Sequence, residues 1–336
     1  MSLLHLYATP LRPLEEVPQP QLLRRLRVLR LSVTDLCNFR CRYCMPATGV
    51  PKFSHCDLIP LERLATMVAW LTSRTGIERV RLTGGEPLVR SGIEQLIARL
   101  SSLPRITEVS LTTNGSLLAN RAQSLKAAGL TRVNISLDSL DKEGFAHVSR
   151  GGRLNRTLAG IDAAREAGLT PIKINTVLHR STWKQEVPRL LDYAARNRLE
   201  IRFIELMRTG TEQAWCESEY ISVDEVCLGL DSEIVAIGEE SQAPARRTLL
   251  NWRGTLVNVG WITPRSHPFC ASCERLRMDA RGQLRRCLMD PTTFDLSGSL
   301  EVLDDLAVEQ EFRSYIADKV PPASMNTSFA MSQIGG

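Results

Sequence analysis

Three cysteines within eight residues are the first feature of this chain that could do chemistry. Cys37, Cys41 and Cys44 form a Cys-x3-Cys-x2-Cys set, and thiolates this close together can wrap one soft metal centre. A structural zinc ion usually takes four ligands, so a zinc site here would need His55 or Cys56 as the fourth. A cubane iron–sulfur cluster held by three cysteines keeps one iron open for another ligand. The spacing alone leaves both alternatives open.

A second set of three cysteines lies more than two hundred residues later. It has the spacing Cys270-x2-Cys273-x13-Cys287. A zinc ribbon would show a second close pair, and Cys287 stands alone. A second cubane cluster with one open iron therefore fits the count better.

The other cysteines fit no ligand spacing. Cys56, Cys216 and Cys227 are expected to be buried thiols, since free cysteine behaves as a small hydrophobic residue. The N-terminus has no charged start followed by an apolar stretch, and no run of eighteen apolar residues occurs. We therefore expect a cytoplasmic protein with reduced thiols and no membrane partner.

The basic residues are nearly all arginine. The net charge is +5, and lysine occurs at only six positions. Arginine offers a planar, permanently charged fork that suits phosphate and carboxylate groups. Codon usage is a sufficient explanation for most of these arginines, so only those inside motifs are given weight. Aromatic residues make up 5% of the chain and no compact basic stripe occurs, which argues against nucleic-acid binding.

These residues must be positioned by an alternating pattern of strands and helices. Short β-branched or apolar runs alternate with amphipathic stretches between residues 28 and 210, which predicts parallel βαβ units. The six expected strands are Val28–Val33, Val80–Thr83, Glu108–Thr112, Arg132–Leu137, Ile172–Val177 and Glu200–Leu206. The loops at the carboxyl ends of parallel strands build the site in such folds, and the first cysteine set follows the first strand.

The alternation stops after Gly210. Residues 245–262 and 274–288 are expected to form short strands joined at Gly254 and Gly282, and residues 299–318 one helix. Residues 1–27 are expected to be an irregular arm with one short helix. The predicted division is therefore an arm (1–27), an α/β domain (28–210) and a smaller C-terminal region (211–336).

The motifs carry a family resemblance. The first cysteine set with Tyr43 before its last cysteine, followed by Gly84-Gly85-Glu86-Pro87 after the second strand, resembles the radical S-adenosylmethionine superfamily. Within it, the chain resembles the GTP 3′,8-cyclase family, which begins molybdenum cofactor biosynthesis. The matching stretches are Leu29–Asp35, Val80–Pro87, Leu111–Gly115, Asn134–Asp138, Arg202–Glu205, the region of Cys270, and Gly335-Gly336.

The resemblance implies a fold, two cofactors and a reaction. The expected fold is α/β, an incomplete six-stranded parallel β/α barrel with a smaller C-terminal region that carries the second cluster. The expected cofactors are two [4Fe-4S] clusters and S-adenosylmethionine. The implied reaction takes a hydrogen atom from the ribose C3′ of GTP, after which C3′ bonds to C8 of guanine.

The resemblance also assigns site residues. Those expected at S-adenosylmethionine are Tyr43, Gly85, Ser136 and Met207. Those expected at GTP are Arg30, Arg81, Thr112, Lys173, Arg275 and Arg277, with Arg202 as a weaker candidate. Arg275 and Arg277 are two residues apart, so in a strand both point to one face. Gly335 and Gly336 are expected to enter the barrel and help position Arg275 or Arg277.

Several positions depart from the family pattern. They are Ser91-Gly92, Ser181-Thr182-Trp183 and Arg208, which puts loop conformations in question and leaves the cluster ligands intact. An unidentified electron donor and the next enzyme of the pathway are expected partners, and the chain a monomer or homodimer. The alternatives are another radical S-adenosylmethionine enzyme that modifies peptides and, less favoured, a zinc module that binds nucleic acid.

Overall fold

The six expected strands form one parallel sheet. The structure is a computed structural model and describes residues 21–54, 57–209, 212–230, 245–319, 322, 326–327 and 331. The strands are β1 (Val28–Ser32), β2 (Arg79–Thr83), β3 (Glu108–Thr113), β4 (Arg132–Ser136), β5 (Lys173–Val177) and β6 (Glu200–Ile204). They lie side by side in chain order, and each pairs with the next in parallel. The predicted parallel α/β fold is confirmed.

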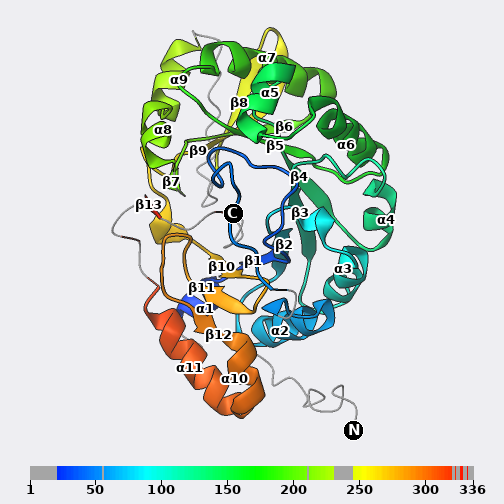
Figure 1. Ribbon diagram of the computed structural model, residues 1–336, viewed down its shortest axis with the longest axis vertical. Coiled ribbons are helices and arrows are strands. Elements are labelled where there is room, and N and C mark those ends of the chain that lie inside the picture. The colour runs from blue at the N-terminus through cyan, green and yellow to red at the C-terminus, as the bar shows by residue number, and fades with distance from the viewer. Residues whose placement is uncertain are drawn as a thin grey trace.

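Helices cover the outer face of this sheet (Figure 1). They are α2 (Leu61–Arg74), α3 (Ile93–Ser101), α4 (Ala122–Ala127), α5 (Lys142–Ser149), α6 (Leu154–Glu166) and α7 (Trp183–Asn197), with a short 3-10 turn, η3 (Pro87–Val89). The spacing of their apolar residues explains the packing, as in α3, which buries Ile93, Leu96, Ile97 and Leu100.

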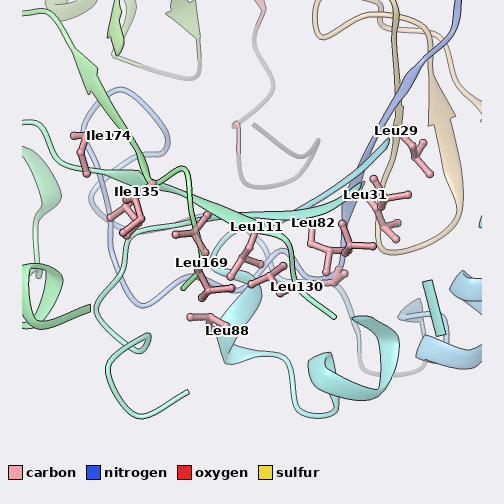
Figure 2. Packing of buried hydrophobic residues seen from close by; sticks show 14 of the residues in the cluster. Leu29, Leu31, Leu82, Leu88, Leu111, Leu130, Ile135, Leu169 and Ile174 are labelled. Carbon is pink, nitrogen blue, oxygen red and sulfur yellow. The ribbon is translucent and has the colours of Figure 1, made fainter. Parts of the chain in front are cut away.

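Alternate residues of each strand face opposite sides of the sheet. Leu29, Leu31, Leu82, Leu111 and Ile135 are fully buried in the core beneath the helices (Figure 2). The residues between them, such as Arg30 in β1, point to the inner face. The helical side is therefore apolar, whereas the inner side is free to carry charged and polar groups.

The sheet does not stop at six strands. β10 (Arg275–Met278) pairs in parallel with β1, and β9 (Thr255–Ile262) pairs in parallel with β6. Antiparallel strands β11 (Gln283–Arg285), β12 (Phe294–Asp295) and β8 (Arg246–Trp252) continue the sheet to eleven strands. The predicted number of strands is therefore not confirmed, because C-terminal strands occupy both edges of the six-stranded unit. The turns expected at Gly254 and Gly282 are present, and both glycines have positive φ.

The single helix expected over residues 299–318 is wrong. Two helices are found, α10 (Leu296–Val302) and α11 (Asp305–Ala317). Leu303 and Asp304 are extended between them, and the Asp304 carboxylate accepts a hydrogen bond from the Ala307 amide at 2.9 Å. A capping aspartate starts a new helix at this point and ends the preceding one.

Short elements complete the described chain. They are α1 (Gln21–Arg25), β7 (Arg208–Thr209), α8 (Gln213–Ser218), α9 (Val223–Gly229), the 3-10 turn η4 (Cys270–Ser272) and β13 (Asn326–Thr327), which pairs in parallel with β7. α1 is the short helix expected in the N-terminal arm. Within the described ranges, no helix has both the length and the apolar character needed to span a membrane.

Candidate active site

The inner face of the sheet encloses a cavity of about 350 Å³. Almost every parallel strand contributes to its wall, and the residues at its two ends come from the first cysteine loop and from the C-terminal region. Predicted residues that line it are Arg30, Tyr43, Arg81, Thr112, Ser136, Arg202, Met207, Cys270, Cys273, Arg275, Arg277 and Cys287. Gly85, Lys173 and the cysteines of the first set are not among the described residues that line it. The fold thus gathers most of the predicted residues around one space.

The first cysteine set lies in the loop that follows β1. Burial raises the pKa of Cys37 to about 11. Burial also raises the pKa of Cys41 well above its usual range, with smaller contributions from Cys44, Asp138 and Cys37. The charges of Cys44 and Cys37 act on Cys41, so the three thiols are neighbours, and burial disfavours the thiolate form of Cys37 and Cys41. This donor set fits an iron–sulfur cluster.

The Gly84-Gly85 turn after β2 packs directly against this loop. The Gly85 amide donates to the Thr34 carbonyl and the Glu86 amide to the Leu36 carbonyl, both at 2.8 Å. A Cβ atom on Gly85 would lie 2.3 Å from the Leu36 oxygen, closer than packed atoms tolerate, so only glycine fits. The contact of Gly85 with S-adenosylmethionine remains a prediction, and its observed role is to support the loop of the first cysteine set.

Glu86 fastens the turn to the next strand from inside the protein. Its carboxylate accepts hydrogen bonds from the Thr113 hydroxyl (2.7 Å), the Asn114 amide (2.8 Å) and the Leu88 amide (3.1 Å). The side chain is buried, and this burial raises its pKa to about 7 despite the three donors. Glu86 is therefore part of the scaffold beneath the first cysteine set.

The raised pKa of Glu86 predicts a pH dependence of stability. The folded protein holds this proton more tightly than the unfolded chain, whose pKa is near 4.5. The contribution therefore stabilises the fold fully below about pH 4.5 and is lost as the pH rises through about 7. At about 1.36 kcal/mol per pKa unit, the loss is about 3 kcal/mol. Urea unfolding of the cluster-free wild-type protein and of cluster-free Glu86→Gln is measured from pH 4.5 to 8. The loss appears as a pH-dependent difference between their free energies of unfolding. A difference that stays constant with pH would contradict the prediction.

Tyr43 is held at both ends. Its hydroxyl donates to Asp138 at 2.8 Å, and its carbonyl accepts from the Thr209 hydroxyl at 2.8 Å. Asp138 also accepts from the Val177 amide at 2.9 Å, and burial raises its pKa to about 6. Asp138 was not assigned a role from the sequence, although it closes the quoted stretch Asn134–Asp138. The loop of the first cysteine set is thereby fixed to β4 and β5.

All three cysteines of the second set line the cavity. Cys270 is in η4, Cys273 precedes β10, and Cys287 follows β11. Burial alone would raise the pKa of Cys273, but the positive charges of Arg275 and Lys319 outweigh it and bring the pKa down to about 7. Cys287 and Cys273 both affect the pKa of Cys270, so the three thiols are neighbours. Among the described His, Cys, Asp and Glu residues, no three are arranged to hold a single metal ion.

Four arginines meet at the floor of the cavity. Burial lowers the pKa of Arg30 well below its usual range, and the nearby charges of Arg277, Arg81 and Arg275 lower it further. Burial and neighbouring positive charges also lower the pKa of Arg81 to about 9 and that of Arg277 to about 10. The Nε atom of Arg81 is buried and has no hydrogen-bond partner among the described residues. Like charges so close together favour an anionic ligand between them.

Lys173 is placed differently from the other predicted cations. Its ammonium forms an ion pair with Glu200 at 2.9 Å, and Arg202 forms a second ion pair with Glu200 at 2.8 Å. Lys173 is buried within this group, whereas Arg202 reaches the cavity. The contact of Lys173 with GTP remains a prediction. Arg202, the weaker candidate from the sequence, is better placed than Lys173.

Some residues of the cavity were missed by sequence reasoning. They are Arg25, Asn175, Glu205, Arg286, Lys319 and Met331. Asn175 could have been found, because it alternates with Val177 on the inner face of β5. Glu205 is fully engaged with the amides of Val223, Arg265 and Ser266 at 2.9–3.1 Å, which gives it a structural role.

The C-terminal segment approaches the first cysteine set. β13 lies beside β7, and the Met331 amide donates to the Cys44 carbonyl at 3.1 Å. Met331 also lines the cavity. Gly335 and Gly336 lie outside the described residues, as do His55 and Cys56. The insertion of the two glycines into the barrel therefore remains a prediction.

The positions that depart from the family pattern have local structural explanations. Arg208 pairs with Glu217 at 2.8 Å, and the Ser181 hydroxyl donates to Glu219 at 2.7 Å. Gly92 has a φ of 81° immediately before α3, a conformation that suits glycine. These contacts hold the loops in place although their residues differ from the family pattern.

Comparisons with known proteins agree with this geometry. The model of the radical SAM superfamily matches residues 31–194, and that of Molybdenum Cofactor Synthesis C matches residues 199–325. A GTP 3′,8-cyclase of Peptoclostridium acidaminophilum is 44% identical over 84% of this chain and 86% of its own. A GTP 3′,8-cyclase of Moorella thermoacetica is 42% identical over 93% of this chain and 98% of its own.

Solved structures share the fold. Streptococcus suis SuiB, in its crystal structure bound to the precursor peptide SuiA, superposes with a TM-score of 0.61. It is 16% identical in sequence, and the match covers 85% of this chain and 66% of SuiB. At that identity the similarity supports the architecture alone.

Proposed function

The chain belongs to the GTP 3′,8-cyclase family of radical S-adenosylmethionine enzymes, and we propose that its cavity holds GTP between the two cysteine sets. The protein converts GTP to (8S)-3′,8-cyclo-7,8-dihydroguanosine 5′-triphosphate, the first step of molybdenum cofactor biosynthesis. One observation supports the proposal most strongly. A single cavity is lined by Tyr43 of the first cysteine loop, by all three cysteines of the second set and by the clustered arginines.

The cofactors are two [4Fe-4S] clusters and S-adenosylmethionine. We assign the first cluster to Cys37, Cys41 and Cys44 and the second to Cys270, Cys273 and Cys287. When bound, the first cluster and S-adenosylmethionine supply the radical that removes hydrogen from C3′ of the ribose. Thiols that are mutual neighbours within each set support both assignments.

The protein's own residues position the reactants. Arg30, Arg81, Arg275 and Arg277 supply charge-assisted donors for the triphosphate, which carries several negative charges. Thr112 adds a hydroxyl group for GTP from β3 in the wall of the cavity. Tyr43, Gly85, Ser136 and Met207 are assigned to S-adenosylmethionine, and the fixed position of Tyr43 supports this placement.

Replacing Arg275 or Arg277 with alanine is expected to weaken GTP binding. Each change removes a charged hydrogen-bond partner worth about 1.5–3 kcal/mol, which corresponds to a roughly ten- to hundredfold loss of affinity. Lysine should rescue poorly because it lacks the planar fork. Equilibrium binding of GTP to the cluster-loaded protein measures the loss.

Arg281 provides a matched control. It lies in the turn that follows β10, stacks its guanidinium on Phe53 at 4.2 Å, and is not among the described residues of the cavity. Arg281→Ala should leave GTP affinity unchanged. Wild-type affinity in both Arg275→Ala and Arg277→Ala would disprove the placement of the triphosphate.

We also propose a setting for the enzyme. None of the eight described cysteines forms a disulfide, which is in keeping with the proposed reducing, cytoplasmic location. The reaction needs an electron donor and hands its product to the next enzyme of the pathway, with the chain acting as a monomer or homodimer. We propose that the division at residue 210 separates two functions. The part before it provides the ligands of the first cluster, and residues 211–336 provide those of the second. Peptide modification has less support, because the similarity of this chain to SuiB, crystallised with a precursor peptide, extends to the fold alone.

A further inference from the structure

We propose that Lys319 raises the reduction potential of the second cluster by directing its ammonium group at the sulfur of Cys273. The inference rests on the proposed assignment of that cluster to Cys270, Cys273 and Cys287. Lys319 lies just beyond the end of α11 and belongs to none of the motifs by which the chain resembles its family. It is a residue for which the sequence alone offers no role.

The position of Lys319 relates it to two of the three ligands. Its Nζ atom is 3.8 Å from the Cys273 sulfur and donates a hydrogen bond to the carbonyl of Arg286. Arg286 immediately precedes Cys287 in the chain. The ammonium group therefore connects the two separate segments that supply Cys273 and Cys287, and it lies at the wall of the cavity.

The segment around Lys319 is held firmly. The Arg286 side chain donates to Asp290 at 2.7 Å and to the carbonyl of Tyr315 in α11 at 3.1 Å. Its guanidinium also stacks on the Tyr315 ring at 4.6 Å and pairs with Asp318 at 3.5 Å. These contacts fix the end of α11 against the strand that leads to Cys287. Lys319 is thereby kept at the thiol instead of extending into solvent.

The charges around Lys319 indicate what it does. The groups that act on it are Cys273, Cys287, Arg275 and Arg277. Both arginines are assigned to GTP, whose phosphates would neutralise them. Asp290 and Asp318 are paired with Arg286. Arg275 also acts on the Cys273 sulfur, by its charge and by a side-chain hydrogen bond. Because Arg275 is assigned to GTP, Lys319 is a positive charge at this sulfur that the phosphates would leave in place.

A positive charge at a ligand sulfur favours the reduced cluster. Reduction adds one negative charge to the cluster and its thiolates, and a hydrogen-bond donor at the sulfur stabilises that charge. Removing the ammonium while keeping the length of the side chain should therefore make the second cluster harder to reduce. Arginine should preserve much of the effect, because it keeps the charge and the donors.

The test is a redox titration of the second cluster alone. Cys41→Ala removes the first cluster, so the spectroscopic signal of the reduced protein comes from the second. In this background, Lys319→Met should shift the reduction equilibrium about tenfold toward the oxidised form, or about 59 mV for one electron. Lys319→Arg should shift it much less. Lys184→Met, a change at an exposed lysine in α7, should have no effect.

Each result is decisive. An unchanged potential in Lys319→Met overturns the proposal, as does a loss of GTP affinity without a change in potential, which would make Lys319 a phosphate ligand. If Lys319→Met retains no iron, Lys319→Gln is titrated in its place. Loss of iron in both of these variants, with iron retained in Lys319→Arg, would show that Lys319 acts in cluster assembly, and this result also overturns the proposal. A Cys41→Ala protein without any cluster would instead refute the second-cluster assignment itself.

Discussion

Changing Cys41 to alanine is expected to abolish reductive cleavage of S-adenosylmethionine and to halve the iron content. Cys41 is the middle residue of the first set, which is assigned to the first cluster, and Cys44, Asp138 and Cys37 are its charged neighbours. The other described thiols lie in the second set or in α8 and α9. Anaerobic assay of 5′-deoxyadenosine formation, together with iron analysis, measures both effects.

Two variants serve as comparisons for Cys41→Ala. Cys273→Ala should also halve the iron, yet it leaves the first set intact and should retain some uncoupled cleavage of S-adenosylmethionine. Cys216→Ala changes a fully buried thiol of α8 that belongs to neither set, and it should keep all the iron. Zinc in place of iron at either set of a reconstituted, active enzyme would show that the two-cluster assignment is wrong.

The second large effect is expected at Gly335 and Gly336. Replacing both with leucine should lower the rate of cyclisation about a hundredfold while both clusters stay assembled, since misplacement of a substrate by about 1 Å can cost that much. Met331 lines the cavity and donates to the Cys44 carbonyl. Glycine allows backbone to approach a ligand closely.

The measurements for this variant are product formation and S-adenosylmethionine cleavage on the same sample. Cleavage should persist without a matching yield of product, because the two glycines are proposed to position Arg275 or Arg277 and no proposed ligand of the first cluster is changed. Gln333→Leu places a leucine at another position of the same segment and should have a much smaller effect. Cyclisation at the wild-type rate in the double leucine variant would refute a role for the two glycines.

Local patterns predicted the half of the fold in which neighbours in sequence are neighbours in space. Each strand from β1 to β6 pairs with the next one along the chain, so alternation of strands and helices was enough to arrange them. Arg30, Arg81 and Thr112, which the family resemblance placed at GTP, lie on these strands and line the cavity. The strand pairs at the two edges join distant segments, as in Val28 beside Arg275. No local pattern specifies such a pairing.

The site shows the same limit. The cysteine sets were found because their spacing is specific, and the arginines because the family resemblance assigns them to GTP. Asp138 was overlooked although it lies in a quoted motif. Lys319 was overlooked because a lone lysine at the end of a helix gives no local signal. Its position depends on the contacts of Arg286 with Tyr315 and Asp290, which form only when the chain folds. The break between α10 and α11 was missed because one capping aspartate ends an otherwise continuous helical pattern.

The strands that flank the parallel unit have a consequence for how the protein is made. A ribosome completes β1 to β6 long before it reaches β9 and β10, which cover the two outer strands. Until then, the nascent chain presents two bare strand edges, which are prone to pair with other chains. The region that carries the second cysteine set therefore also covers these exposed strand edges. A premature stop within the C-terminal region would therefore produce an aggregation-prone folding intermediate, and not only an enzyme that lacks the second cluster.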